Sequence, residues 1–388
     1  MEDVSDWYVG KSRIAALLHH FSEIADTRAP WRVAHPLPEI LFLVVCGTIT
    51  GCDDFDEISD WGEAQLPFLR RFLPFYHGVP SGRWLNILMN RMDPDLFAAC
   101  FTAWVREIWP DRADQIAIDG KTSRRSHDHG TGKTALHLVS AFATTHELVL
   151  GQEAVAEKTS ETTAIPTLID RLAADDGLKD SLVSIDAVAC NAHIAGRIRE
   201  AGADYLLALK GNQPSLRAEA EALFEHHASS LETAQTVEKG HGRIEHRTVT
   251  VCRDVDWLNG ERRFPGEWHF PDTATLIQVQ AQTQSRNQSH SDTRYFISSR
   301  HLNADEAARA VRGHWAIENQ LHWVLDVTFN DDQARCRTGH GAKNMAVVRH
   351  LALNLVRGLN DKRSLRRRRR RAGWDPDYLA AILCLNIP

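Results

Sequence analysis

The sequence of 388 residues lacks the usual signatures of a secreted or membrane protein. Its seven cysteines are scattered and contain no CxxC pair, which is typical of reduced, mostly buried thiols and not of a disulfide framework. The longest apolar run, Ile40 to Ile49, is too short to span a bilayer and is interrupted by Gly47. The first residues, MEDVSDWYVG, are acidic and unlike a signal peptide. We therefore expect a cytoplasmic protein without membrane contact.

The chain also lacks the overall positive charge of many nucleic-acid-binding proteins, since its formal net charge is −6. This charge is unevenly distributed. Residues 301–388 carry 15 Lys and Arg against 9 Asp and Glu, a net of +6, so the first 300 residues carry −12. Such an asymmetry favours a polyanionic partner for the C-terminal part. The composition, 43% apolar and 25% charged, is that of an ordinary globular protein, and the length suggests two or three domains.

The hydrophobic pattern changes near residue 110, and this change predicts the domain organisation. Residues 1–105 have apolar side chains at helical spacing, which predicts a helical N-terminal domain. Residues 114–211 contain three strand-like runs with hairpin-like connections, followed by alternating helix and strand patterns. They predict an α/β fold, in which a mixed five-stranded sheet is flanked by helices.

The remaining residues predict an insertion, a second part of the core and a tail. Residues 212–300 begin with a helical pattern and then alternate like half-buried strands, so we expect a mainly β insertion. Residues 301–360 contain a long helical pattern, Ala304 to Val327, and return to the core. Residues 361–388 are a basic C-terminal segment.

Three acidic residues stand where they can converge. Asp119 follows the apolar run Gln115 to Ile118, and Asp186 follows Ser181 to Ile185, so each is expected at the end of a buried strand. Taken singly, a strand-terminal aspartate is also a common turn residue. Together with Glu318 in the long helix, however, the acidic residues follow a strand, follow a second strand and lie in a helix, in this order along the chain. Three carboxylates at one point repel each other unless divalent cations neutralise them, as in a two-metal phosphoryl-transfer site.

Glu318 is the least easily explained of the three. Trp315, Leu321 and Leu325 share its face at helical spacing, so we expect the carboxylate on a packed apolar face. An isolated buried charge is costly, and the alternative to a metal is an ion pair with an arginine such as Arg312.

Long blocks of the sequence resemble insertion-sequence transposases with an Asp-Asp-Glu triad, specifically the H-repeat-associated (ISAs-type) branch. The resemblance covers nearly the whole chain. The blocks that carry it are HPLPEILFLVVCGTITGCDDFDEISDWG, AIDGKTSRRS, SIDAVACNAHIAGRIREAGADYLLALKGNQ, EKGHGRIEHRTVTV, RYFISSR, RGHWAIENQLHWVLDVTFNDDQARCR and AVVRHLALNLVR.

The resemblance implies a ribonuclease-H-like core, a helical N-terminal domain, and a β-rich insertion before the glutamate. We expect the N-terminal domain to help recognise transposon ends; the alternative is that it only packs against the rest of the protein. It implies that Asp119, Asp186 and Glu318 are the catalytic, Mg²⁺-binding triad, holding two ions for which Mn²⁺ can substitute, with no organic cofactor. The expected activity is cleavage at insertion-sequence ends and strand transfer. The expected partners are double-stranded DNA, both terminal repeats and target, and a second copy in a homodimer. An inactive end-binding relic and a nuclease without strand transfer are the alternatives.

The sequence departs from the family pattern at several positions. Pro80-Ser81 continues with Gly82-Arg83-Trp84, which leaves the DNA contacts of the N-terminal domain open. His314 and Leu325 stand where the wider clan often has arginine and lysine. Those residues hold flipped or hairpinned DNA in the clan, so a hairpin intermediate is not assumed.

Basic side chains near the acids and in the tail are candidate DNA contacts. Each also has a simpler interpretation, such as a solvated loop, a turn or a packed histidine. We expect the six consecutive arginines to lie exposed, because packed guanidinium groups repel one another. The candidates are Lys121, Arg124, Arg125, Lys210, His314, His322, Arg366, Arg367, Arg368, Arg369, Arg370 and Arg371. Asn191 is expected either to orient Asp186 or to cap the helix that begins at residue 192.

Overall fold

The computed structural model describes residues 12–109, 114–128, 130, 132–155, 160–227, 230–240, 243–259, 269–284 and 289–385. The expectation about MEDVSDWYVG concerns residues outside these ranges. All seven cysteines are free, and four of them, Cys46, Cys100, Cys190 and Cys252, are buried. Among the described residues, no helix combines the length and the apolar character that a membrane span requires.

The N-terminal part is helical, as the sequence predicts. At the start of several of its helices, a side-chain oxygen accepts a hydrogen bond from a backbone N–H group of the first turn. Asp93 does so for the N–H groups of Asp95 and Leu96, with Pro94 in the first helical position. The helices are α1 (Arg13–Glu23), α2 (Leu37–Thr50), α3 (Phe55–Ala64), α4 (Leu66–Leu69), α5 (Gly82–Arg91) and α6 (Pro94–Ile108).

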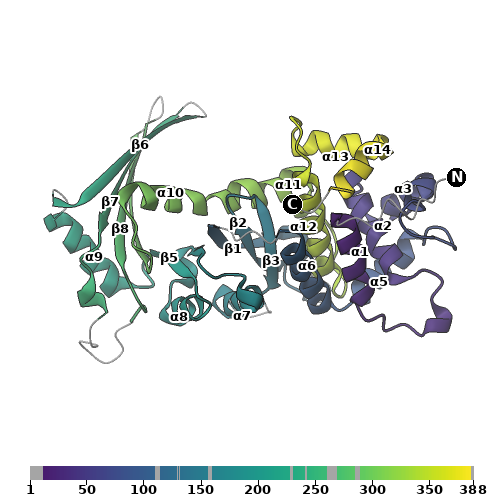
Figure 1. Cartoon of the computed structure of the whole chain (residues 1–388), viewed down its shortest axis with the longest axis horizontal. Helices are drawn as coiled ribbons and strands as arrows, with labels where there is room; N and C mark the ends of the chain where they lie inside the picture. The colour runs from purple at the N-terminus through teal and green to yellow at the C-terminus, as the bar shows by residue number, and fades with distance from the viewer. Residues whose placement is uncertain are drawn as a thin grey trace.

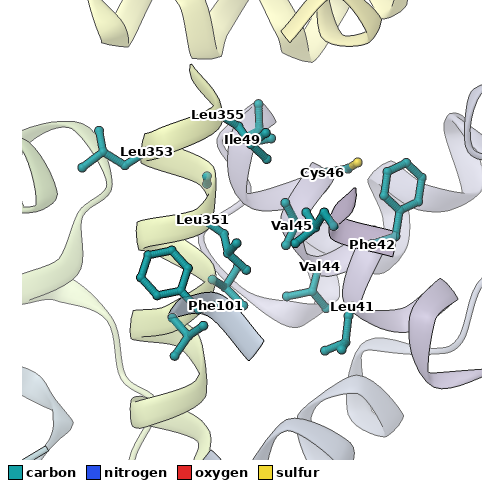
Figure 2. Close-up of a cluster of buried hydrophobic side chains, with 14 of the residues drawn as sticks. Leu41, Phe42, Val44, Val45, Cys46, Ile49, Phe101, Leu351, Leu353 and Leu355 are labelled. Carbon is teal, nitrogen blue, oxygen red and sulfur yellow. The ribbon is translucent and has the colours of Figure 1, made fainter. Parts of the chain in front are cut away.

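The C-terminal helices α12 (Gly341–Gly358), α13 (Leu365–Trp374) and α14 (Pro376–Leu383) return to these N-terminal helices. α12 packs against α2, α5 and α6, and α13 against α2. Figure 2 shows the resulting contact, in which Phe42 and Val45 of α2, Phe101 of α6, and Leu351 and Leu355 of α12 belong to one buried cluster. The N-terminal helices therefore share a core with the C-terminal ones and do not pack as a separate unit, which corrects that part of the sequence interpretation.

The central sheet begins as the sequence predicts. β1 pairs with β2, and β2 with β3, in antiparallel fashion, while β4 is parallel to β1 and β5 is parallel to β4. These strands are β1 (Gln115–Ser123), β2 (Leu136–Ala143), β3 (Leu148–Ala154), β4 (Leu182–Ile185) and β5 (Asp204–Leu209).

The prediction of five strands is wrong, because the sheet has nine, in the order β3-β2-β1-β4-β5-β9-β8-β7-β6. The last four, β6 (Glu232–Gly240), β7 (Arg243–Cys252), β8 (Thr275–Gln284) and β9 (Ser289–Ser298), come from the expected insertion. β9 pairs antiparallel to the edge of β5, so the insertion satisfies the free backbone groups of that edge and continues the core sheet. Figure 1 shows these strands at the opposite end of an elongated molecule from the N-terminal helices.

Helices cover both faces of the sheet. α7 (Glu161–Ala173) and α8 (Ala192–Glu200) lie together on one face with Ile116 and Ile118 of β1, and α9 (Pro214–His227) precedes the insertion strands. On the other face, α10 (Ala304–His314) crosses from β6 and β7 to β1 and β4, and leads into α11 (Trp323–Thr328) (Figure 1). α10 thereby connects the insertion to the centre of the sheet.

Candidate active site

Parallel pairing of β1 and β4 brings the two aspartates together. Ile118 pairs with Ile185 in the parallel register, and Asp119 and Asp186 are the next residues of their strands. Adjacent strands lie about 4.8 Å apart, so the two carboxylates begin from neighbouring backbone positions. As the sequence predicts, each aspartate directly follows an apolar strand segment, and these two segments pair with each other.

Asp119 is not at a strand end, however, which corrects the expectation. β1 continues to Ser123 because its antiparallel pairing with β2 continues, with Asp119 opposite Ser140. Only the pairing with β4 ends at Ile118. Beyond that point none of the described strands pairs with β1 on its β4 side, and Asp119 and Asp186 follow directly.

Specific polar contacts dock the glutamate helix onto β1 and β4. The Gln115 side chain donates from Nε2 to the Ala310 carbonyl at 2.7 Å and to Ser184 Oγ at 3.1 Å. His314 Nδ1 lies 3.1 Å from Ser184 Oγ. Gly313 permits the close approach, because a Cβ there would overlap Gln115 Oε1. These contacts hold α10 so that the chain after it passes over the two aspartates.

Glu318 lies in a π-helical segment, Ile317–His322, between α10 and α11. π segments widen one turn of a helix and are common at functional sites. The predicted α-helical face is therefore broken: Leu321 and Leu325 are buried, as expected, but Glu318 is exposed. The expectation of a packed carboxylate is wrong. The alternative ion pair is not formed either, since Arg312 binds Glu238.

The electrostatics of Asp119 show that the carboxylates influence one another. Burial, together with the charges of Glu161, Glu318 and Asp186, raises the pKa of Asp119 to about 7 against an opposing hydrogen bond from the Gly120 backbone. His322 Nδ1 lies 3.5 Å from Asp119 Oδ2. Burial lowers the pKa of His322 to about 4, so at neutral pH it supplies no positive charge.

Basic side chains lie near Asp186 and Glu318 and act to lower the pKa of each carboxyl group. Lys210 Nζ lies 3.2 and 3.3 Å from the two oxygens of Asp186. Burial acts to raise the pKa of Asp186, but a hydrogen bond from Ala187 and the charge of Lys210 outweigh it and lower the pKa. Partial burial and the charge of Asp186 raise the pKa of Glu318, and Arg294 and Lys210 act in the opposite direction.

A cavity of about 390 Å³ adjoins this site. Asp186 and Glu318 lie in its wall, and so do three basic side chains, Lys210, Arg217 and Arg294. Arg294 belongs to β9, so the insertion contributes directly to the wall of the site. Arg294 and Arg217 were not among the predicted contacts, because neither lies close to Asp119, Asp186 or Glu318 along the chain.

The residues present fit a divalent cation. The donors are carboxylate oxygens, the ligands that Mg²⁺ and Mn²⁺ prefer. In the ion pairs that the structure describes, no lysine or arginine reaches Asp119, whose pKa is raised by burial and by neighbouring carboxylates that a cation would neutralise.

A second acidic cluster, Asp326, Asp331 and Asp332, is closer together but is not a metal site. Its ligand atoms lie within 4.8 Å of one another, in the only such group among the described residues. Lys121 Nζ already occupies it, at 2.7, 3.0 and 3.4 Å from the three carboxylates, and Arg349 binds Asp331 at 2.9 Å. Lys121, a predicted DNA contact, is thus mostly buried and held inside the protein.

The other predicted contacts near the acids differ in their exposure. Arg124 and Arg125 are exposed in a short 3₁₀ turn after β1, and Arg124 lies 3.4 Å from Asp332. Burial lowers the pKa of His314, which faces Ser184 and not solvent. Asn191 accepts a hydrogen bond from the Ile194 N–H and so caps α8, which confirms one of its two expected roles.

The arginine run forms most of α13, and the expectation that it lies exposed is wrong for part of it. Arg366, Arg367 and Arg370 are exposed, and Arg368 and Arg371 are half-buried. Arg369 is buried: it donates to the carbonyls of Thr48 and Ile49 at 2.8 and 3.3 Å, and its guanidinium lies 4.0 Å from the centre of the Phe329 ring. Repulsion does not prevent this, because side chains one residue apart on a helix point in different directions.

The fold and site define an α/β protein with a carboxylate centre suited to divalent cations. Residues 110–355 match the family described as "Transposase DDE domain", and residues 18–105 match the one described as "DDE_Tnp_1-associated". The chain therefore belongs to the DDE transposase family. Family membership implies dependence on divalent metal in general.

Related proteins agree with this assignment. The chain is 37% identical over 376 residues to the "H repeat-associated putative transposase YhhI" of Escherichia coli (strain K12), covering 95% of this chain and 97% of that protein. It is 36% identical to the "Putative transposase YncI" of Escherichia coli O157:H7, covering 95% of each chain. A piggyBac transposase synaptic complex with hairpin DNA aligns with a TM-score of 0.43 and 12% identity, covering 98% of this chain and 81% of that one.

Proposed function

We propose that this protein is an active DNA transposase that cleaves DNA at insertion-sequence ends and joins those ends to target DNA. The observation that carries the proposal is the convergence of Asp119, Asp186 and Glu318 at the point where the β1–β4 pairing ends. Two of these residues are fixed by strand register, and the third by the docking of α10. Family membership supports the reaction class, and this geometry supports the choice of residues.

Asp119, Asp186 and Glu318 would hold two Mg²⁺ ions, for which Mn²⁺ can substitute. Bound divalent cations would activate the attacking oxygen and stabilise negative charge on the transferred phosphate. Gln115 and Gly313 keep Glu318 near the strands by holding α10 against them. His322 restricts the Asp119 side chain from the opposite side.

Cationic side chains around the cavity would position the DNA backbone. Lys210 is more than half exposed and pairs with Asp186 only at the rim, so it can exchange that carboxylate for a phosphate. Arg294 and Arg217 line the same cavity. The exposed Arg124 and Arg125, and the exposed arginines of α13, would contact phosphates farther from the reacting centre.

The partners would be double-stranded DNA and a second copy of the chain in a homodimer, acting in the bacterial cytosol. Residues 1–105 would help to recognise the terminal repeats. Because this helical segment shares its core with α12 and α13, its orientation relative to the site is fixed by packing. Deleting it should therefore destabilise the whole protein, and end recognition is better tested by substitutions at its surface.

The test is an assay with end DNA, target DNA and Mg²⁺ that resolves nicked, cleaved and joined products. The proposal predicts joined product. Binding without cleavage would identify an inactive relic, and cleavage without joining would identify a nuclease; either result refutes the proposal. Ca²⁺ should support binding with little cleavage, because its looser coordination positions the attacking oxygen poorly.

A further inference from the structure

Glu161, the first residue of α7, approaches the site from the side opposite Glu318. Its Oε1 lies 2.7 Å from Nε2 of His137, whose Nδ1 lies 2.7 Å from Thr122 Oγ1. A Cβ on Gly120 would overlap both Glu161 Oε1 and His137 Nε2. The glutamate carboxylate therefore rests against the backbone of β1, one residue from Asp119, and a side chain at position 120 would displace it.

The two faces of the sheet meet at this point. Side chains alternate along β1, so Ile118 and Gly120 face α7, and Asp119 faces the π segment with Glu318. In the middle of a sheet this would keep Glu161 and Asp119 apart. Here β4 ends at Ile185, and none of the described strands pairs with β1 on that side beyond Ile118. Groups from both faces can reach the same opening.

Charge points to a shared ligand for these groups. Glu161 is the first of the neighbouring carboxylates that act on Asp119, ahead of Glu318 and Asp186. In the ion pairs that the structure describes, the partner of Glu161 is His137, and that of Asp119 is His322. No lysine or arginine in that set compensates either carboxylate, whereas Asp186 has Lys210. Asp119 and Glu161 are therefore neighbouring acids that no lysine or arginine pairs with among the described ion pairs.

We propose that Glu161 is a fourth carboxylate of the active site and holds divalent cation together with Asp119. This inference rests on the proposed function only insofar as the site binds divalent cations. His137 orients the glutamate by its hydrogen bond, and Thr122 orients the imidazole. Carboxylate oxygens added from α7 supply the hard donors that Mg²⁺ and Mn²⁺ prefer.

The alternative is that Glu161 has a purely structural role. It lies in the first turn of α7, where a carboxylate stabilises the helix dipole, and it pairs with His137. Two variants separate these roles. Gly120→Ala displaces the carboxylate but keeps the acidic residue in the first turn of α7, and Asp95→Asn removes an exposed first-turn carboxylate from α6.

The experiment measures Mn²⁺ binding by the full-length protein without DNA, using electron paramagnetic resonance to quantify free Mn²⁺. Glu161→Gln should weaken binding by about tenfold or more, and so should Asp119→Asn. Asp95→Asn should stay within about threefold of wild type. Gly120→Ala, which displaces the Glu161 carboxylate without removing any charge, should reproduce the loss and serves if Glu161→Gln folds poorly by circular dichroism.

The outcomes distinguish this inference from the proposed function. If Asp119→Asn weakens Mn²⁺ binding and Glu161→Gln binds as Asp95→Asn does, the inference is overturned and the triad stands. If Asp119→Asn also binds Mn²⁺ like wild type, the metal site itself is refuted.

Discussion

Arg369→Ala should destabilise the protein strongly, although it lies in a run of six arginines. Its guanidinium caps the C-terminal end of α2, where the Thr48 and Ile49 carbonyls have no partner within the helix. Burial lowers the pKa of Arg369 to about 10, so it remains charged at neutral pH. Removal leaves two buried carbonyls unsatisfied, at about 1–3 kcal/mol each, and abolishes a contact with Phe329 worth about 2 kcal/mol. Because these contributions overlap, we expect a loss of about 3–5 kcal/mol.

Arg370→Ala is the matched control, since it removes the same charge from the next position of α13 but from an exposed side chain. Its effect should stay within about 0.5 kcal/mol of wild type. Urea unfolding followed by circular dichroism compares the two variants. If Arg369→Ala and Arg370→Ala unfold within about 0.5 kcal/mol of each other, the buried cap that the structure describes does not exist in solution.

Three further predictions follow from the packing. Replacing Arg366, Arg367 and Arg370 with Gln should weaken binding to all DNA sequences alike and reduce the log–log salt slope by about 0.9 for each lost phosphate contact; an unchanged slope would exclude this surface as a DNA contact. Lys121→Met should cost about 3 kcal/mol of stability, because it uncovers three carboxylates; wild-type stability with weaker DNA binding would contradict its internal role. Burial lowers the pKa of His350 from 6.5 to about 3, so the folded state disfavours its protonation and loses stability as the pH falls from about 6.5 towards 3; His350→Leu should flatten that part of the stability curve measured in urea, and an equally steep curve would refute it.

The sequence predicted the two strands that precede the aspartates, because a buried strand has a local pattern of apolar residues. Apolar runs ending at Ile118 and Ile185 predicted two buried strands, and strand register then places Asp119 beside Asp186. It could not show that β1 continues to Ser123, because that depends on pairing with β2. The orientation of Glu318 was also not predictable, since a π turn conforms to no regular apolar spacing.

Features that depend on distant contacts were missed. Arg369 is buried because α13 returns to the end of α2, more than 300 residues earlier, and nothing in an arginine run distinguishes its fourth member. The nine-stranded sheet depends on the pairing of β9 with β5. The alternation of apolar and polar residues along a strand does not show which other strand it pairs with. Glu161 follows a segment without a recognisable motif, and only the fold places it beside Gly120.

The central claim is that Asp119, Asp186 and Glu318 act as one catalytic unit. The most direct measurement is cleavage of end DNA with Mg²⁺ by Asp119→Asn, Glu318→Gln and the double variant, with DNA binding measured in parallel. The account predicts wild-type binding and a loss of cleavage by about 100-fold or more in each single variant, with little further loss in the double variant, because the residues act together. A Glu318→Gln protein that nicks end DNA at the wild-type rate would contradict it.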